Sequence, residues 1–202
     1  MSAVDDEEIR QAVERAVSRV MGLSQPAPGP ASAPPQEAAP APQPASTPGA
    51  EHAKVIAIGA DHGGFELKEI IKTDLAGMGF KVSDVGTHGK DPVDYPDYAH
   101  EVARFVRSGL AWRGIMIDGA GIGSCIVANK VPGIRAGMAY DTSSAVNSRE
   151  HNDTNVLTLG AGLIGVNLAR QIVKTWLTTE FGGGRHARRI QKITDVEVEY
   201  LK

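Results

Sequence analysis

This 202-residue sequence has a single cysteine, and it lacks long apolar runs and an excess of basic residues. The single cysteine, Cys125, excludes an intrachain disulfide and favours a reducing compartment. No apolar run approaches the ~20 residues that span a bilayer, and the acidic N-terminus lacks the apolar segment of a secretory signal. Lys and Arg number 21 against 24 Asp and Glu, unlike a dedicated nucleic-acid binder. These absences predict a cytoplasmic protein that binds neither membranes nor nucleic acid.

Proline is scarce outside one stretch, because nine of the 12 prolines lie between Pro26 and Pro48. This stretch is almost entirely Pro, Ala, Ser and Gln, and it has too little apolar bulk to offset the entropy lost on ordering. We expect residues 24–52 to form a disordered linker. The linker divides the chain into an N-terminal segment, residues 1–23, and a folded domain, residues 53–202.

The N-terminal segment has the pattern of an amphipathic helix. Apolar residues at Ile9, Val13, Val17 and Val20 repeat at helical spacing over residues 5–22, after an acidic first turn. An isolated helix of this length is marginal in water, so its apolar face needs a partner. That partner is another protein, the chain's own domain or a membrane surface. The long linker favours another protein over the chain's own domain, and the acidic polar face disfavours a membrane.

The folded domain alternates short apolar runs with longer segments of helical period. Five alternations of this kind predict an α/β fold, a three-layer αβα sandwich around a Rossmann-like five-stranded parallel sheet covered on both faces. The expected strands are residues 55–60, 81–86, 114–118, 134–140 and 155–161, and the expected helices are 65–79, 97–110, a short helix after 123, 142–150, 163–180 and one starting at Arg185.

Ligands of open parallel sheets bind beyond the carboxyl ends of the strands. Asp61 and His62 follow the first strand and precede two glycines, which suits a polar ligand; helix capping by Asp61 alone is the alternative. The glycine loop, residues 119–123, offers backbone amides to an anion or an oxyanion. It is not a phosphate-binding P-loop, because no Gly-Lys-Ser/Thr follows it. A dinucleotide site, in which Asp141 would bind the ribose, is also disfavoured, because the glycines are spaced GxGxG and not GxGxxG.

Other polar residues have a functional and a structural interpretation. His151 is either a general acid or base or a surface histidine at a helix end. Arg185 and Arg189, four residues apart, either bind a phosphate or carboxylate or form a solvated basic end. Cys125, inside the short helix, is expected to be a buried structural thiol. The six histidines and the cysteine have no metal-ligand spacing, so no metal site is predicted.

Five motifs, in order, resemble the ribose-5-phosphate isomerase B family, which includes the galactose-6-phosphate isomerase subunits. The motifs are GADHGGFELK (59–68), VDYPDYA (93–99), GAGIGSCIVANKVPGIRAG (119–137), REHNDTNVLTLGA (149–161) and GGRHARR (183–189). The resemblance implies an enzyme that interconverts aldose and ketose phosphates without metal or cofactor. It also implies a homodimer or a tetramer, with active sites at the subunit interface.

The resemblance assigns roles residue by residue. Asp61 and His62 would contact the sugar, and Gly119, Ala120, Gly121, Ile122 and Gly123 would hold the enediolate oxygens. His151 would be the acid that assists ring opening, with Asn152 beside it. Arg185 and Arg189 would bind the phosphate from the partner subunit.

Two departures from the family pattern affect these roles. Many members have a cysteine as the base immediately before the glycine loop, and here that position is Asp118. Others have a glutamate at the position of Ser124. A carboxylate can abstract the same proton, so we take Asp118 as the candidate base. The family also often has a phosphate-binding arginine where this chain has Gly162.

The N-terminal segment and linker resemble the encapsulation peptides of bacterial microcompartment enzymes. This resemblance implies that residues 1–22 bind a shell protein and that the enzyme resides in a microcompartment lumen. The leading hypothesis is an isomerase of ribose 5-phosphate and ribulose 5-phosphate. The alternatives are an isomerase of another sugar phosphate, such as the galactose 6-phosphate type, and a non-catalytic sugar-phosphate-binding relative.

Overall fold

The computed structural model describes residues 54–200, and the predicted targeting helix and linker lie outside them. Strands and helices alternate along this part of the chain, as the hydrophobic pattern indicates. The elements are β1 (Val55–Ala60), α2 (Phe65–Gly77), β2 (Lys81–Asp84), α3 (Tyr95–Arg107), β3 (Arg113–Asp118), α4 (Ile122–Ala128), β4 (Ala136–Met138), α5 (Thr142–Glu150), β5 (Val156–Gly160), α6 (Val166–Thr178) and α7 (Arg185–Tyr200).

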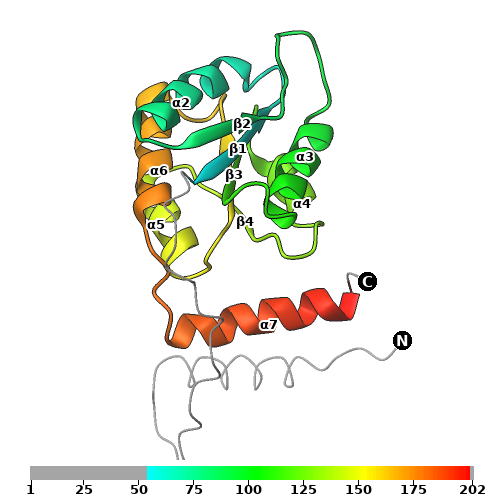
Figure 1. Cartoon of the computed structure of the whole chain (residues 1–202), viewed down its shortest axis with the longest axis vertical. Helices are drawn as coiled ribbons and strands as arrows, with labels where there is room; N and C mark the ends of the chain where they lie inside the picture. Colours follow the sequence, from blue (N-terminus) through cyan, green and yellow to red (C-terminus); the bar gives the residue numbers. More distant parts are fainter. Residues whose placement is uncertain (1–53, 201–202) are drawn as a thin grey trace, which may run out of the picture. The chain divides into compact units, whose positions relative to one another are not determined.

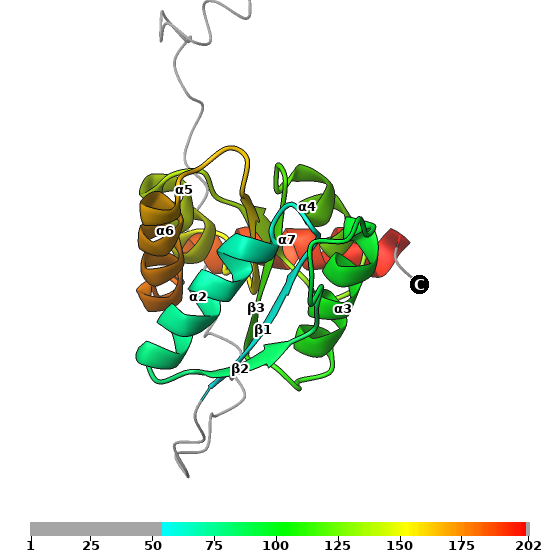
Figure 2. The same cartoon turned by 90° about the horizontal axis from the view of Figure 1, so that it is seen from above.

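The five strands form one parallel sheet in the order β2-β1-β3-β5-β4. Helices α2, α5 and α6 cover one face of this sheet, and α3 and α4 cover the other (Figures 1 and 2). The predicted Rossmann-like αβα sandwich is therefore confirmed. The last helix, α7, belongs to neither layer and lies across the amino ends of the strands (Figure 1).

Each face of the sheet has its own apolar core. The side chains under α2, α5 and α6 include Ile58, Ile117, Leu159 and Trp176, all without exposed surface. The smaller core on the other face packs α3 and α4 against the sheet around residues such as Met116. Near-continuous apolar strands supply both cores at once, as expected for a sheet covered on both sides.

Some element boundaries differ from those expected. Helix α3 begins at Tyr95, before Pro96, because proline is tolerated in the first turn of a helix, where its missing N–H would have no partner. Strand β4 has only three residues, not the expected 134–140, because it lies at the edge and pairs with β5 alone. Among the helices described over residues 54–200, none is both long and apolar enough to cross a membrane.

Candidate active site

Polar residues after β1 and β3 meet at the carboxyl edge of the sheet. We call Asp61, His62 and residues 118–124 the carboxyl-edge cluster. Asp61 is 8% exposed, and its carboxylate accepts a hydrogen bond from the amide of Gly64 at 2.9 Å. Gly64 itself is the N-cap of α2, so Asp61 closes the turn before the helix and is not its capping residue. A Cβ on Gly63 would lie 3.7 Å from the amide nitrogen of Gly119, so the two segments are in contact.

Asp118 lies at the centre of the glycine loop and is 4% exposed. One of its carboxylate oxygens accepts hydrogen bonds from the amides of Ala120, at 2.8 Å, and Gly121. The other accepts from the amide of Ser124, at 3.3 Å, and from its hydroxyl. The candidate base is thus bound by its own loop. The described hydrogen bonds to Asp118 leave the amides of Gly119, Ile122 and Gly123 unused.

Glycines let the loop approach the strands closely. Gly121 has a left-handed backbone, with φ of 77°, and a Cβ there would lie 2.9 Å from the carbonyl carbon of Leu159. A Cβ on Gly160 would lie 2.6 Å from the carbonyl carbon of Ala120. Buried Thr158 donates a hydrogen bond to the carbonyl of Gly121 at 2.9 Å. The loop is therefore fixed to β5 by contacts that larger residues would prevent.

The segment around Tyr95, at the start of α3, supplies a residue that the sequence analysis did not select. The Tyr95 ring lies against Gly123, where a Cβ would be 2.5 Å from the phenolic oxygen. Nearby, His62 Nδ1 is 3.2 Å from both the amide nitrogen and the carbonyl oxygen of Val93. Tyr95 belongs to the VDYPDYA motif, and that motif was the sequence feature from which its place in the site could have been predicted. This segment and the glycine loop therefore meet at the carboxyl edge.

The other predicted site residues lie at the opposite, amino edge of the sheet. We call His151, Asn152, Arg185 and Arg189 the amino-edge cluster. His151 ends α5, which runs antiparallel to the strands, and Arg185 begins α7. The amide of Gly182 donates to the carbonyl of Glu150 at 2.9 Å, which joins these two helix ends. Strand β5 separates the clusters, and five residues at about 3.3 Å each span roughly 16 Å. A single chain does not bring the two clusters together.

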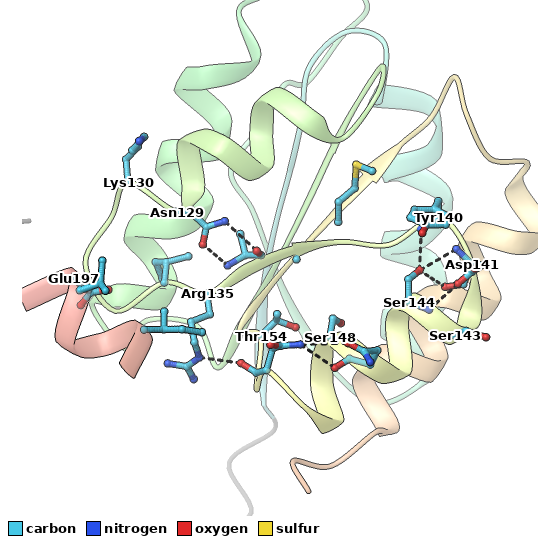
Figure 3. A pocket seen from close by; sticks show the side chains of 18 of the residues that line it. Asn129, Lys130, Arg135, Tyr140, Asp141, Ser143, Ser144, Ser148, Thr154 and Glu197 are labelled. Atoms are coloured by element: carbon cyan, nitrogen blue, oxygen red, sulfur yellow. Dashed lines mark hydrogen bonds between the residues drawn. The ribbon is translucent and has the colours of Figure 1, made fainter. Parts of the chain in front are cut away.

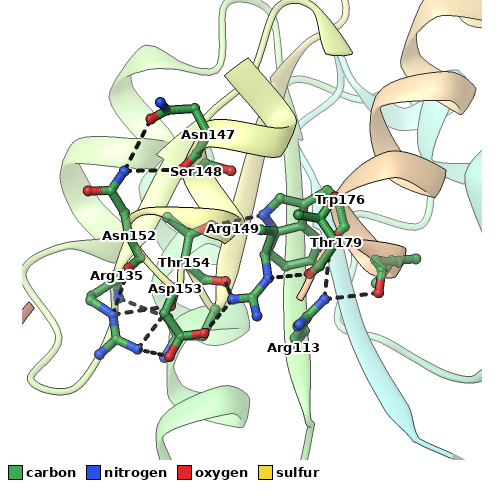
Figure 4. A network of polar contacts seen from close by, with 12 residues as sticks. Arg113, Arg135, Asn147, Ser148, Arg149, Asn152, Asp153, Thr154, Trp176 and Thr179 are labelled. Carbon is green, nitrogen blue, oxygen red and sulfur yellow. Dashed lines mark hydrogen bonds and ion pairs between the residues drawn. The ribbon is translucent and has the colours of Figure 1, made fainter. Parts of the chain in front are cut away.

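A polar network fixes the backbone beside His151 and Asn152 (Figure 4). Asp153, in a left-handed conformation with φ of 44°, accepts from Arg135 at 2.9 Å and from Arg149 at 2.7 Å. Arg149 also donates to the carbonyl of Thr154, whose hydroxyl accepts from the indole of Trp176 at 2.9 Å. The turn that carries His151 and Asn152 is therefore held on several sides.

Arg113 lies beside this network, next to the rings of Trp112 and Trp176 (Figure 4). It donates to the carbonyls of Trp176 and Leu177, at 3.1 and 3.2 Å. Burial lowers the pKa of Arg113 to about 10, and the nearby charge of Arg149 contributes in the same direction.

His186 is a second residue that the sequence analysis did not select. Its ring stacks on that of His151, with ring centroids 4.2 Å apart and an angle of 6° between the planes. His186 is 8% exposed. It stands between Arg185 and Arg189 in the GGRHARR motif, where the two arginines were the more obvious ligands.

Two other expectations concern Asp141 and Cys125. Asp141 is the N-cap of α5, and its carboxylate accepts from the amide of Ser144 at 2.6 Å in a capping box. Its oxygens therefore serve the helix. Cys125 is half-buried, not fully buried as expected, and its thiol lies 3.5 Å from the carbonyl oxygen of Ala136. Within residues 54–200 no group of three or more His, Cys, Asp or Glu side chains is arranged to hold a metal ion.

A cavity of about 860 Å³ runs along the unpaired side of β4 (Figure 3). Its lining extends from Asp141, near the carboxyl edge, to Asn152, at the amino edge, and α7 forms one wall. The apolar side chains of α7 are largely exposed: Val196 by 57%, Val198 by 69% and Tyr200 by 72%. The groove thus connects the two edges of the sheet along an uncovered flank.

Known proteins similar to this chain share its sequence and fold over the described domain. The ribose/galactose isomerase family model matches residues 56–193. The ribose-5-phosphate isomerase B of Escherichia coli is 46% identical over 144 residues, which are 71% of this chain and 97% of that protein. A D-erythrulose-4-phosphate isomerase of Pectobacterium atrosepticum is 45% identical over 140 residues, which are 68% of this chain and 91% of that protein. The solved structure of Clostridium thermocellum ribose-5-phosphate isomerase B has a TM-score of 0.72 and 52% identity, covering 72% of this chain and 99% of that one.

Proposed function

The chain belongs to the ribose/galactose isomerase family and is a sugar-phosphate isomerase of the ribose-5-phosphate isomerase B type, and from this premise we propose that it interconverts ribose 5-phosphate and ribulose 5-phosphate through an enediolate, without metal or cofactor. The observation that carries the proposal is the carboxyl-edge cluster. There a buried carboxylate, Asp118, lies within a loop whose remaining amides are available to an oxyanion.

The reaction requires a base that moves a proton between two carbons. In our proposal Asp118 removes the proton from C2 of the open-chain aldose, and the resulting enediolate takes a proton at C1 to give the ketose. The hydroxyl proton moves from O2 to O1. The amides of Gly119, Ile122 and Gly123 stabilise the enediolate oxygens, and Asp61 and His62 bind the sugar hydroxyls. To act as a base, the Asp118 carboxylate must exchange a hydrogen bond from its loop for the substrate.

The remaining roles belong to the amino-edge cluster of a second copy of the chain. His151 protonates the ring oxygen as the sugar opens, with Asn152 beside it, and Arg185 and Arg189 bind the phosphate. This arrangement requires a homodimer, and its support is that the groove beside β4 and the exposed face of α7 offer an apolar surface that joins both edges. A tetramer would be a pair of such dimers.

A mixture of two inactive variants tests the shared site. Asp118→Asn damages the carboxyl edge and His151→Gln the amino edge, so a mixed dimer contains one site with both changes and one intact site. Random assortment makes half of the dimers mixed, so the refolded mixture should recover about a quarter of the wild-type activity. Each variant refolded alone is the control. A mixture no more active than its components would exclude a site shared between two chains.

Ribose 5-phosphate itself is tested by nuclear magnetic resonance in deuterated water. Wild-type protein should exchange the C2 proton and produce ribulose 5-phosphate. A protein that binds the aldose phosphate but leaves it unchanged would be a non-catalytic relative.

An isomerase of another sugar phosphate is the second candidate. One relative of similar identity is named a D-erythrulose-4-phosphate isomerase. In addition, Gly162 replaces a cationic residue frequent in the family, and a Cβ there would lie 3.0 Å from the carbonyl oxygen of Gly119. The glycine loop thus occupies space that an arginine stem would need. Turnover of tetrose or hexose phosphates, in the absence of ribose 5-phosphate turnover, would favour this candidate.

We also propose that residues 1–22 bind a microcompartment shell protein and that the enzyme works in the compartment lumen. The support is the helical spacing of apolar residues and the proline-rich linker that follows. Residues 1–22 fused to a fluorescent protein should co-localise with shells in cells that produce them. A fusion with Val13→Asp and Val17→Asp, which breaks the apolar face, is the matched control. Diffuse fluorescence of the unaltered fusion would contradict the proposal.

A further inference from the structure

The stacked histidines of the amino-edge cluster join two segments far apart in the sequence. His151 follows α5, while His186 is the second residue of α7. Their parallel rings, 4.2 Å between centroids, are in face-to-face contact. His186 forms the inner side of the pair, with 8% exposure, whereas the side chain of His151 is 36% exposed. The inner ring therefore limits how the outer ring can turn.

The edge of the His151 ring is also fixed. Its Nδ1 lies 2.8 Å from the amide nitrogen of Asn147, and the Asn147 oxygen lies 3.3 Å from the side-chain nitrogen of Asn152. In this chain of hydrogen bonds, Asn152 donates to Asn147, and Asn147 donates to Nδ1 of His151. That assignment leaves the ring proton on Nε2, which lies 3.9 Å from Glu150. A proton on Nε2 is available for donation.

The surroundings of His186 disfavour its protonated form. Burial lowers the pKa of His186, as do the charges of His151, Arg185 and Arg189, while Glu150 acts in the opposite direction. Arg185 Nε lies 3.5 Å from His186 Nε2, which places the His186 proton on Nδ1. That buried Nδ1 has no hydrogen-bond partner within the described residues. A buried polar group without a partner is costly, so the ring is not explained by stability alone.

We propose that His186 is a positioning residue for His151: its buried ring stacks beneath the outer ring and holds Nε2 pointing out of the subunit, toward a substrate. The inference deepens the proposed function and rests on the role given there to His151. His186 touches no substrate in this arrangement. Its effect on catalysis is the orientation of the proton donor.

The direct test uses the ring protons of His151, observed by nuclear magnetic resonance without substrate. Stacking should shift these signals upfield through the ring current of His186. His186→Ala should abolish this shift and broaden the ring-proton signals of His151. His186→Phe, which retains an aromatic face, should preserve the shift. His100→Ala, on the exposed side of α3, is the matched control. His151 signals unaffected by His186→Ala would overturn the proposal.

Kinetics on ribose 5-phosphate provide the second readout. His186→Ala should lower kcat by about 10- to 100-fold, the cost of a misplaced catalytic group, with little change in KM. His186→Phe should recover most of that loss. Equal losses in the two variants, at equal Tm, would overturn the positioning role. A wild-type protein without turnover would contradict the proposed function. The ring-proton measurement needs no turnover, so it tests the stacking of His186 on His151 separately from that outcome.

Discussion

The two edges of the sheet are built from different materials. At the carboxyl edge, backbone amides, glycines and a buried carboxylate pack so closely that a methyl group would clash at Gly121 and Gly160. At the amino edge, long side chains project from helix ends, and Arg185 and Arg189 are exposed. A backbone-built site is rigid before substrate arrives, whereas exposed side chains gain their geometry from what they bind. The comparison indicates that proton transfer between the two carbons belongs to the first edge and that the arginines of the second edge bind the charged phosphate.

The largest effect is expected from removing the candidate base at the carboxyl edge. Asp118→Asn should lower C2 deuterium exchange and ketose formation by about 10²- to 10⁴-fold, because the amide cannot accept the proton. Asparagine can still accept from the amides of Ala120 and Gly121, so the loop should persist. Ser124→Ala is the control, since it removes a hydrogen bond to Asp118 but keeps the carboxylate. Exchange at the wild-type rate in Asp118→Asn would show that Asp118 organises the loop and that another group is the base.

Changes to the arginines of the amino edge should affect substrate binding and not the chemical step. Arg189→Met should raise KM for the sugar phosphate by about 10- to 100-fold, because a hydrogen bond to a charged group contributes about 1.5–3 kcal/mol, while kcat stays close to wild type. Steady-state kinetics measure both constants. Arg188→Met, the next residue along α7, is the matched control. A fall in kcat alone would argue that Arg189 acts on the reacting atoms.

A smaller effect tests the close packing of the carboxyl edge. Gly64→Ala places a methyl group against the carbonyl of Ile117 and should lower the free energy of unfolding by about 1–3 kcal/mol. Gly77→Ala, at the end of α2 with open space around it, should leave stability unchanged or slightly raised. Urea denaturation compares the two. Equal stability of the two variants would mean that the turn after β1 adapts easily.

The smallest effect separates the edges by pH. Burial lowers the pKa of His186, so the stability it supports is present above about pH 6.5 and declines as the pH falls below that value. Asp84 ends a strand at the carboxyl edge. Burial raises the pKa of its carboxyl group, but the hydrogen bonds from Lys68 and Lys72 lower it by more, so the pKa of Asp84 lies below its usual value. The corresponding stability persists down to about pH 4 and is lost below it.

Thermal unfolding across pH 3 to 8 measures both transitions. His186→Phe should remove the decline that begins near pH 6.5, and Asp84→Asn should flatten the decline below about pH 4. A wild-type curve with no slope between pH 7 and 5 would contradict the contribution of His186.

The sequence was sufficient for the order of the elements and for the carboxyl-edge cluster. Continuous apolar strands predict a parallel sheet that is covered on both faces. Asp61, Asp118 and the glycine loop lie at the carboxyl ends of strands, so a parallel sheet brings them to one edge. The position of His151 relative to them was not readable from spacing, because it depends on the direction of α5. His186 was also missed, since stacking joins residues 35 positions apart and leaves no local pattern. Tyr95 was hidden by a boundary placed after Pro96.

The buried indole of Trp176 gives the protein an optical property of its own. The chain has two tryptophans, and both rings lie near Arg113, with centroids 4.0 and 5.1 Å from its guanidinium carbon. Trp176 is fully buried and donates a hydrogen bond to Thr154, which lies two residues after Asn152 of the amino-edge cluster. Trp112, in contrast, is only partly buried and stacks on Phe80. Intrinsic fluorescence should therefore include a blue-shifted component from Trp176. Its change on adding a sugar phosphate would report events at the amino edge without any attached dye.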